Sequence, residues 1–256
     1  MHQEFRTMKN FIYTLAVAIS FSAVSFAQKS KDIKVTIDLK NVTNDKVMVT
    51  VTPPAFDTET TTYFIPKVIP GAYSEDNYGQ FIEGLKALDK KGNELAVTKA
   101  DMNSWKIHDA KKLAKITYLV NDSFDNEANH GIFSPSGTNI LAGRNFLINT
   151  HGFVGYFENK SETPYEITVN HPANLWGATS LIDTDASNET DVFISPRYPD
   201  LVDHPIMYSK PDYSTFTVDG MEILIAVYSP TGLITAKMIT PEMEKMMRAQ
   251  KKFLGP

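Results

Sequence analysis

The amino-acid sequence predicts a mainly β protein, an antiparallel β-sandwich or large folded sheet, with a C-terminal strand and helix that begin an α/β unit. Three observations predict this class. Short runs of β-branched and aromatic residues recur along the chain with turn residues between them. Residues 33–39 alternate strictly between apolar and polar side chains, as a half-buried strand does. A clear helical pattern is confined to the C-terminal end, after Thr240.

The first predicted element is a β-hairpin. Residues 33–39 and 46–52 form its two strands, because the first alternates in polarity, the second runs back as a valine-rich stretch, and residues 41–45 between them supply a turn. Pro53 and Pro54 then end the second strand, since proline has no backbone N–H to donate to a neighbouring strand.

Further strands are expected at short intervals. The turn at residues 90–93 contains Gly92 and predicts a second hairpin between residues 81–89 and 94–97. Residues 126–142 are irregular and are expected to form a surface excursion. Trp105 and Trp176 are interpreted as large fillers of the core or of the space between sheets. The remaining predicted strands are residues 61–65, 104–108, 114–120, 153–157, 165–169 and 192–194.

The C-terminal region changes character. A proline-punctuated link at residues 198–206 precedes a predicted strand at 221–228 and a helix, which Thr240 is expected to cap and which has Pro241 at its first position. One strand and one helix cannot enclose a core, so they either pack onto the preceding β-unit or belong to a longer protein. We interpret the apolar stripe of the helix as a packing face rather than a binding groove; it consists of Met243, Met246, Met247 and Leu254.

The N-terminus has the features of a secretion signal. Arg6 and Lys9 give a positive start, and the apolar run 11–26 is shorter than the about 20 residues of a membrane span. Small residues then precede Gln28, where we expect cleavage. Met8 is an alternative start, and an uncleaved anchor is the alternative to cleavage. We therefore expect an exported protein, periplasmic or extracellular, with no stable membrane anchor after signal cleavage.

The amino-acid composition narrows the classes of protein to which this chain can belong. The protein has 256 residues, no Cys and a formal net charge of −5. The absence of Cys excludes a lipidated cysteine after the signal and disulfides within the chain. The mild acidity, without a dominant basic run, argues against nucleic acid as a partner. The predicted division is a signal peptide at 1–27, an N-terminal β-domain at 28–206 and an incomplete further domain at 207–256.

A complete catalytic motif is missing from the sequence. There is no His-Glu-x-x-His, Gly-x-Ser-x-Gly or phosphate-binding glycine pattern. Convergence of His130, His151 and His171 would make a zinc site, but ordinary loop and strand histidines are the preferred interpretation. Turn capping is likewise preferred to acid/base chemistry or calcium binding for two acidic pairs, Asp122 with Asp125 and Asp183 with Asp185.

Five segments, in this order, resemble the N-terminal β-domain of the M61 metallopeptidases, the glycyl aminopeptidases. The first is residues 65–73, which contain a Pro-Gly turn before Tyr73. Val68 stands where that family often has Trp, and His204 where a smaller residue is usual. The resemblance extends over about residues 30–256, and its other segments are residues 85–92, 99–105, 172–181 and 201–206.

The resemblance implies that the complete protein continues into a thermolysin-like domain with a His-Glu-x-x-His motif and a further Glu ligand. Zinc is expected there and no cofactor in this chain, so no catalytic or metal residue is assigned here. Tyr73, Asp203 and Pro205 are expected to lie near the substrate cleft. The implied partners are the protein's own catalytic domain and a peptide substrate, with an N-terminal Gly or Ala favoured.

Two functions therefore compete. The leading hypothesis is the non-catalytic β-domain of an exported zinc aminopeptidase, inactive as this chain alone. The alternative is a stand-alone exported β-sandwich that binds a carbohydrate or a peptide through aromatic residues near Tyr73 or Tyr198.

Overall fold

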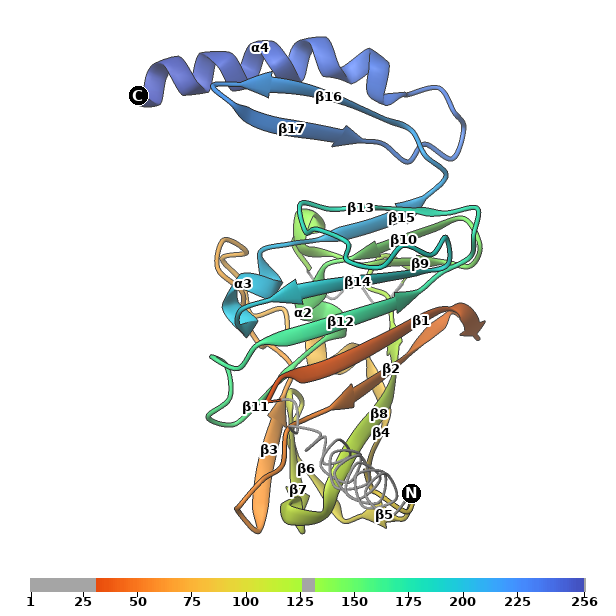
Figure 1. Ribbon diagram of the computed structural model, residues 1–256, viewed down its shortest axis with the longest axis vertical. Coiled ribbons are helices and arrows are strands. Elements are labelled where there is room, and N and C mark those ends of the chain that lie inside the picture. The colour runs from red at the N-terminus through yellow and green to blue at the C-terminus, as the bar shows by residue number, and fades with distance from the viewer. Residues whose placement is uncertain (1–30, 126–131, 256) are drawn as a thin grey trace, which may run out of the picture. The chain divides into compact units, whose positions relative to one another are not determined.

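The computed structural model describes residues 31–125 and 132–255, which belong to one compact unit. The predicted signal peptide and His130 lie outside these residues. The helices within the described ranges lack the length and apolar character that crossing a bilayer requires. The chain is mainly β, as predicted, with several antiparallel sheets and a long C-terminal helix (Figure 1).

The largest sheet of the described residues has seven strands in the order β14-β12-β1-β2-β8-β4-β5. The pair β1–β12 is parallel, and the other pairs are antiparallel. β12 is distant in sequence from β1, since β2 to β11 lie between them in the chain. The strands are β1 Ile33–Thr43, β2 Lys46–Thr52, β4 Ile82–Asp89, β5 Glu94–Leu95, β8 Leu113–Asn121, β12 Tyr165–Asn170 and β14 Thr190–Ser195.

The predicted first hairpin is confirmed. Strands β1 and β2 pair antiparallel, and Asn44 and Asp45 form the turn with positive φ angles of 49° and 61°, which Asn and Asp tolerate. Alternate residues of both strands are buried, as the polarity pattern requires. The buried apolar residues of the pair are Ile33, Val35, Ile37, Leu39, Val47, Val49 and Val51.

Two four-stranded sheets complete the β-domain. One has the order β11-β3-β7-β6 and the other the order β13-β15-β10-β9. Their short strands are β3 Thr60–Phe64, β6 Val97–Asp101, β7 Ser104–His108, β9 Asn139–Leu141, β10 Asn145–Ile148, β11 Tyr156–Phe157, β13 Trp176–Ala178 and β15 Ile206–Ser209. Single turns of helix connect them: η1 Tyr78–Phe81, η2 Ala110–Lys112, η3 Ser134–Ser136, α2 Thr150–Phe153 and α3 Tyr198–Val202.

A group of buried tyrosines explains why the strand predicted at 153–157 is confirmed only at residues 156–157. The hydroxyl of Tyr118 donates to Phe153 O (2.8 Å), and the N–H of Gly155 donates to the hydroxyl of Tyr63 (2.7 Å). Tyrosine hydroxyls thus satisfy backbone groups that a strand would pair with a neighbour. The segment therefore turns as α2 and pairs only at β11, where Tyr156 faces Phe64 and Phe157 faces Tyr63.

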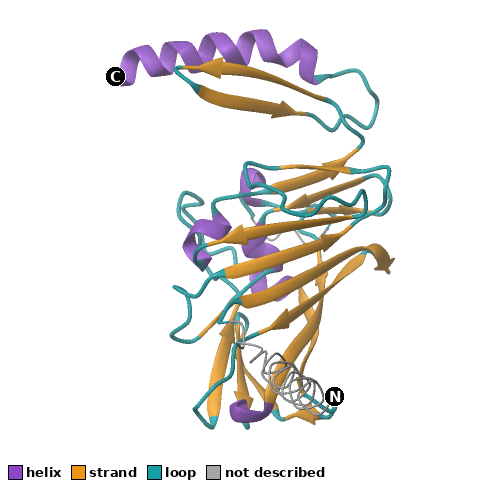
Figure 2. Cartoon of the chain, viewed as in Figure 1, coloured by secondary structure: helices purple, strands orange, loops and turns teal. Residues whose placement is uncertain are grey.

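The C-terminal part forms a hairpin and a helix (Figure 2). Strand β17, Met221–Ala226, confirms the predicted strand, and β16, Tyr213–Val218, pairs with it antiparallel. The helix α4 is Ala236–Leu254 and therefore begins one turn earlier than predicted, with Pro241 in its interior. Thr240 is not its cap: its hydroxyl donates to Ala236 O (2.8 Å) inside the helix. Asp212 instead accepts the N–H of Ala236 (3.1 Å) and satisfies the start of the helix.

Helix α4 covers one face of the hairpin only in part. Met243 and Met247 are half-buried and support the predicted packing face. Phe253 and Leu254 are 89% and 79% exposed, and Met238 and Met246 are also exposed. Within the described residues, β17 pairs with β16 alone, so its outer edge is open. This part thus presents apolar side chains and an unpaired strand edge.

Candidate functional site

The predicted turn before Tyr73 is confirmed. Gly71 has a φ of 87°, and the N–H of Ala72 donates to Ile69 O (3.4 Å), which closes a turn with Pro70 and Gly71 at its centre. Tyr73 follows with a φ of 58° and a side chain that is 99% exposed. An exposed aromatic ring on a strained backbone is a feature of recognition loops.

Asp203 and Pro205 lie in the link between α3 and β15, and both are exposed. The hydroxyl of Thr150 donates to Leu201 O (2.8 Å) and holds the beginning of the link. His204 holds its middle, because its Nδ1 atom lies 2.7 Å from the hydroxyl of Ser180. The proximity of Tyr73, Asp203 and Pro205 to a substrate cleft stays a prediction.

The structure brings together two of the five segments that carry the predicted family resemblance. Strand β13, in segment 172–181, pairs antiparallel with β15, which follows the link. The pairs are Trp176 with Ser209, Gly177 with Tyr208, and Ala178 with Met207. Sequence spacing alone did not indicate this contact, because the two segments are separated by the whole of β14 and α3.

A cavity of about 460 Å³ lies beside β13 and is the candidate functional site. Leu175, Trp176 and Phe193 form its apolar and aromatic wall, and Asn174, Thr179 and Ser187 contribute polar groups. The loop before β14 closes one side with Asp183 and Asn188, and Pro211, at the entrance to the C-terminal hairpin, lies on another.

A buried polar network forms the floor of this cavity. Nε2 of His171 lies 3.2 Å from Oδ1 of Asp191, and the hydroxyl of Tyr208 donates to Oδ2 of the same carboxylate (2.6 Å). Nδ1 of His171 lies 3.1 Å from Pro172 O. His171 is 3% exposed and Tyr208 is fully buried, so these bonds are shielded from water.

The charges of the network follow from this geometry. Both nitrogens of His171 face acceptors, so only the doubly protonated ring donates to Asp191 and to Pro172 together. Burial alone would lower the pKa of His171, but these two hydrogen bonds outweigh it and raise the pKa. Burial would raise the pKa of Asp191, but hydrogen bonds from His171 and Tyr208 hold it below its ordinary value. Both shifts favour the charged forms of the two side chains.

Glycine is required beside this network. A Cβ atom on Gly177 would lie 2.8 Å from Oδ2 of Asp191 and 3.0 Å from the ring of Tyr208. Any side chain there would displace the carboxylate or the ring. The residue at this position of β13 thus sets how closely the strand approaches the ion pair.

The two tryptophans have different roles. Trp105 is buried, with the ammonium group of Lys99 5.1 Å from its ring, and confirms the predicted core filler. Trp176 is half-buried, and its ring centroid lies 4.6 Å from that of Tyr213 at the start of β16. The ring of Trp176 therefore lines the cavity and contacts the C-terminal hairpin at the same time.

The alternative platform near Tyr198 is wrong. Tyr198 is buried, and its hydroxyl donates to Val154 O (2.7 Å). Its ring packs at 4.9 Å from Tyr156 and 5.7 Å from Tyr165. It belongs to the core, and Tyr73 is the exposed aromatic residue that remains from that alternative.

The acidic pairs cap turns, as predicted. Asp122 accepts the N–H groups of Ile140 (2.6 Å) and Asp125 (3.2 Å). Asp183 accepts the N–H groups of Asp185 (2.9 Å) and Val192 (2.8 Å). In the described ranges, one group of acidic or histidine side chains is close enough together to hold an ion: Asp45, Asp122 and Asp125. Hydrogen bonds already use both oxygens of Asp122.

The described histidines do not combine into a metal site. Nε2 of His151 lies 3.1 Å from Ser136 O, and its ring packs against Tyr78 at 4.5 Å. Burial lowers the pKa of His151, so this ring is neutral, in contrast to His171. The preferred interpretation of these two residues as ordinary structural histidines is consistent with their contacts.

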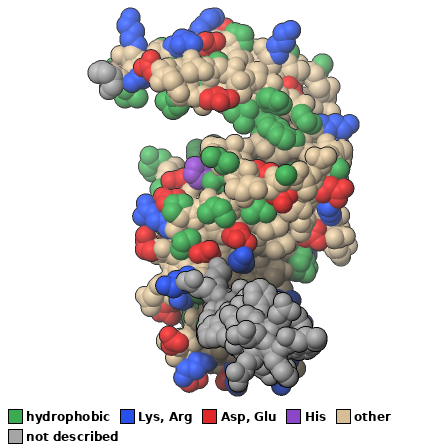
Figure 3. Space-filling model, in the orientation of Figure 1, with side chains coloured by type: hydrophobic (Ala, Val, Ile, Leu, Met, Phe, Trp, Pro, Cys, Tyr) green, Lys and Arg blue, Asp and Glu red, His purple; other side chains and the backbone are tan. Residues whose placement is uncertain are grey.

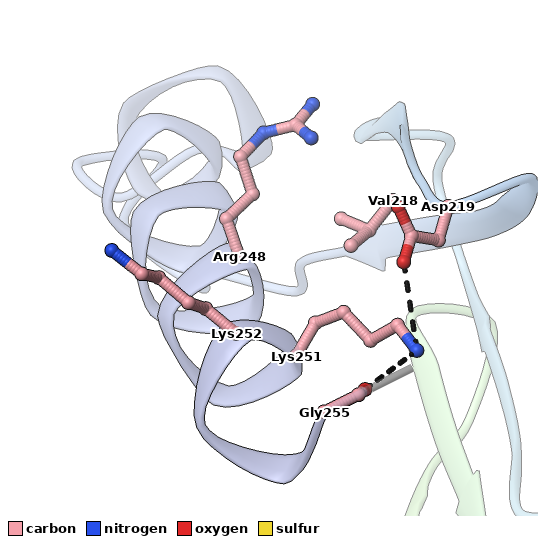
Figure 4. Close-up of a pocket in the computed structure, with 6 residues that line it drawn as sticks. All are labelled: Val218, Asp219, Arg248, Lys251, Lys252 and Gly255. Carbon is pink, nitrogen blue, oxygen red and sulfur yellow. Dashed lines mark hydrogen bonds and ion pairs between the residues drawn. The ribbon is translucent and has the colours of Figure 1, made fainter.

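A second hollow of about 390 Å³ lies at the end of α4 (Figure 4). Lys251 points toward Asp219 (3.5 Å) and donates to Gly255 O (3.0 Å), whereas Lys252 points away from Val218. The hollow is shallow, and its principal cation is already paired. On the face shown in Figure 3, basic and acidic side chains are interspersed, as in a solvated surface.

The network does not present a free general base. A general base needs a free imidazole nitrogen within reach of the proton that it abstracts, and both nitrogens of His171 are occupied. Sequence reasoning missed this network because its residues come from three strands. The available signal was the pairing of the predicted strands 165–169 and 192–194, which places His171 next to the residues that precede β14.

Fold and site together define a class: a β-domain built from several antiparallel sheets, with a buried ion pair under a polar cavity and an exposed aromatic loop. The chain belongs to a known family, since the family of the peptidase M61 N-terminal domain matches residues 34–210. The predicted resemblance is thereby confirmed. No curated protein matched the chain.

One solved structure supports the fold. A crystal structure of an aminopeptidase N family protein from Idiomarina loihiensis superposes with a TM-score of 0.70 at 20% identity. The alignment covers 85% of this chain and 36% of that one, so this chain spans about a third of its relative. A mutant M1 zinc metallopeptidase from Deinococcus radiodurans, bound to a Tyr-Ser-Ala substrate, gives 0.41 at 10% identity, with 82% and 51% covered.

Proposed function

We propose that this chain is the non-catalytic N-terminal part of an exported, zinc-dependent aminopeptidase and that it flanks the substrate cleft of the complete enzyme. The observation that carries the proposal is the family match across residues 34–210, followed directly by a hairpin and helix with exposed apolar residues. An exposed apolar surface of this kind is unfavourable in water, so the proposal expects further structure to cover it.

One contact supports a fixed connection between the β-domain and the hairpin. The ring of Trp176 in the β-domain packs against Tyr213 at 4.6 Å, and within the C-terminal part Asp212 accepts the N–H of Ala236 at the start of α4. A cleft needs walls that keep their geometry while substrate binds. In the proposed enzyme, the 203–205 link and Tyr73 contact the peptide.

The zinc of the proposed enzyme is held outside the residues described here. Asp45, Asp122 and Asp125 offer only carboxylate oxygens, whereas catalytic zinc sites combine histidine nitrogens with a carboxylate. The histidines of the described part are engaged by Ser136, Asp191, Pro172, Ser180 and Thr98. This chain therefore contributes shape and contacts, and no catalytic step is assigned to its residues.

The sequence of the gene beyond the codon for Pro256 tests the proposal at once. The proposal expects an open reading frame with a His-Glu-x-x-His motif and a later Glu. A stop codon in place of that frame would contradict it. The exposed Tyr73 favours the alternative in that case, a stand-alone exported β-sandwich that binds a carbohydrate or a peptide.

Export is tested separately. We expect the protein recovered from the periplasm or the medium to begin at Gln28. Edman sequencing or mass spectrometry of the mature N-terminus checks this. An intact Met1 or Met8 would refute the proposed cleavage without affecting the assignment of the β-domain.

A further inference from the structure

A third cavity, of about 290 Å³, adjoins the candidate site at Pro211. It lies where the turn between β9 and β10 meets the entrance to β16 and the loop between β17 and α4. The turn contributes Arg144, and the chain just before β16 contributes Lys210. Tyr228, beyond the end of β17, lines the cavity too. Three segments that are distant in sequence thus place polar groups around one space.

The hydroxyl of Tyr228 is the first sign of a ligand. Its oxygen is buried and has no hydrogen-bond partner among the described residues. Buried hydroxyl groups in folded proteins nearly always have a hydrogen-bond partner. Without one, the group loses its hydrogen bonds to water on folding and gains none in return. A ligand oxygen in the cavity that Tyr228 lines would supply the missing acceptor.

The charge around the cavity indicates the sign of the charge on that ligand. Within the described ranges, neither Arg144 nor Lys210 takes part in an ion pair with another side chain. Asp212 also lines the cavity, but one of its oxygens is engaged by the N–H of Ala236. Two cations and one carboxylate leave a net formal charge of +1, which matches a single negative charge.

The remaining wall is apolar and specifies the rest of the ligand. Pro211, Val227 and Ile234 contribute apolar surface to the cavity. A ligand with one anionic oxygen pair and an apolar body fits this combination better than a phosphate, whose second charge and polar surface the cavity does not match.

We propose that this cavity binds the carboxylate of a small apolar acid. The carboxylate pairs with Arg144 and Lys210 and accepts the hydroxyl proton of Tyr228, while the apolar body packs on the proline and aliphatic wall. The same chemistry is offered by a free amino-acid derivative and by the C-terminal end of a short peptide. The inference does not depend on the proposed peptidase function.

Calorimetric titration of a protein made of residues 28–256 tests the proposal. The probes are N-acetyl-L-leucine and N-acetyl-L-leucinamide, which differ in charge but hardly in size. We expect saturable binding of the acid and at least roughly tenfold weaker binding of the amide. Equal binding of both probes, or binding of neither, overturns the proposal. Ala-Ala-Leu with a free C-terminus distinguishes the source, since tighter binding than the acetylated amino acid identifies a peptide end.

Variants locate the site. Tyr228→Phe and Arg144→Gln are each expected to weaken binding of N-acetyl-L-leucine several-fold. Lys252→Gln is the matched control, because it also removes an exposed cation but lies at the end of α4, away from this cavity. Circular dichroism melting checks folding, and Tyr228→Phe should melt no lower than the parent. Unchanged affinity in both cavity variants, or an equal loss in the control, rejects this location.

Discussion

Nε2 of His171 lies 3.2 Å from Oδ1 of Asp191, and this pair joins the end of β12 to the neighbouring strand β14 beneath the candidate cavity. Tyr208 of β15 donates to the other oxygen of the same carboxylate. One carboxylate therefore connects the seven-stranded sheet with the sheet that contains β13 and β15. The geometry of the candidate site depends on this ion pair.

The pair makes stability depend on pH. The pKa of His171 is raised above 6.5, so its contribution is complete below that pH and is lost as pH rises through the folded-state value. The pKa of Asp191 is lowered from 3.8, so its contribution is present above that pH and is lost as pH falls through its folded-state value. The stabilisation is thus largest between these two ordinary values. His171→Gln should lower the free energy of unfolding more at about pH 5 than at about pH 9.

Urea unfolding of the parent and of His171→Gln at both pH values measures this difference. His204→Gln is a control with a partly exposed histidine that is not paired with a carboxylate. A deficit for His171→Gln that stays constant with pH, or grows as pH rises, would show that the ring is held neutral.

The tyrosine network anchors the segment 153–155. The hydroxyl proton of Tyr118 goes to Phe153 O, so the hydroxyl of Tyr63 donates to Tyr118, 2.8 Å away. Burial raises the pKa of Tyr118 well above its ordinary value, which keeps the proton in place. Tyr118→Phe leaves buried groups unpaired and should cost about 1–3 kcal/mol of unfolding free energy. Tyr73→Phe, on an exposed ring, should cost nothing measurable in the same denaturation experiment.

Gly155 tests the close approach of two strands. A Cβ atom there would lie 1.9 Å from Phe64 O, a backbone atom that cannot move alone. Gly155→Ala should therefore destabilise the protein by about 2–3 kcal/mol. Gly92→Ala is the control, since the space around it is open and only its φ of 85° is strained, at about 1 kcal/mol. Equal midpoints for the two variants in thermal melting would refute the steric argument.

Asp212 is predicted to fix the start of α4. Asp212→Ala removes the acceptor for the N–H of Ala236 and should cost about 1 kcal/mol, with fraying of the first helical turn. Hydrogen exchange of the amides at residues 236–240 reports the fraying. Asp219→Ala, an exposed carboxylate at the other end of the hairpin, should leave these amides protected. Unchanged exchange in Asp212→Ala would mean that packing alone orders the turn.

Alternation made several strands predictable from the sequence, although β16, which also alternates, was not predicted. The hairpin of β1 and β2, and also β8 and β12, bury one face each, and burial of every second residue leaves a period of two in the sequence. Strands β9, β10, β13 and β15 were not predicted, because they have only three or four residues and no period can be recognised. Helix α3 was missed for the same reason within the proline-rich link.

The remaining differences come from tertiary contacts. Thr240 and Pro241 are a good helix start by local preference, but Asp212 satisfies an earlier start from another segment. The site was hidden in the same way, since the pairing of β12 with β14 brings His171 to Asp191, and Tyr208 reaches the same carboxylate from another sheet. The turn before Tyr73 was predicted because a proline-glycine pair is a local signal, whereas Tyr198 was misjudged because burial is not local.

The central claim is that this chain supplies a supporting wall and leaves hydrolysis to residues beyond it. Zinc-dependent hydrolysis of alanyl and glycyl peptides measures it most directly, with the protein of residues 28–256 compared with the complete product of the gene. The account predicts turnover by the complete product and none by residues 28–256, with or without added zinc. Zinc-dependent turnover by residues 28–256 alone, or none by the complete product, would contradict it.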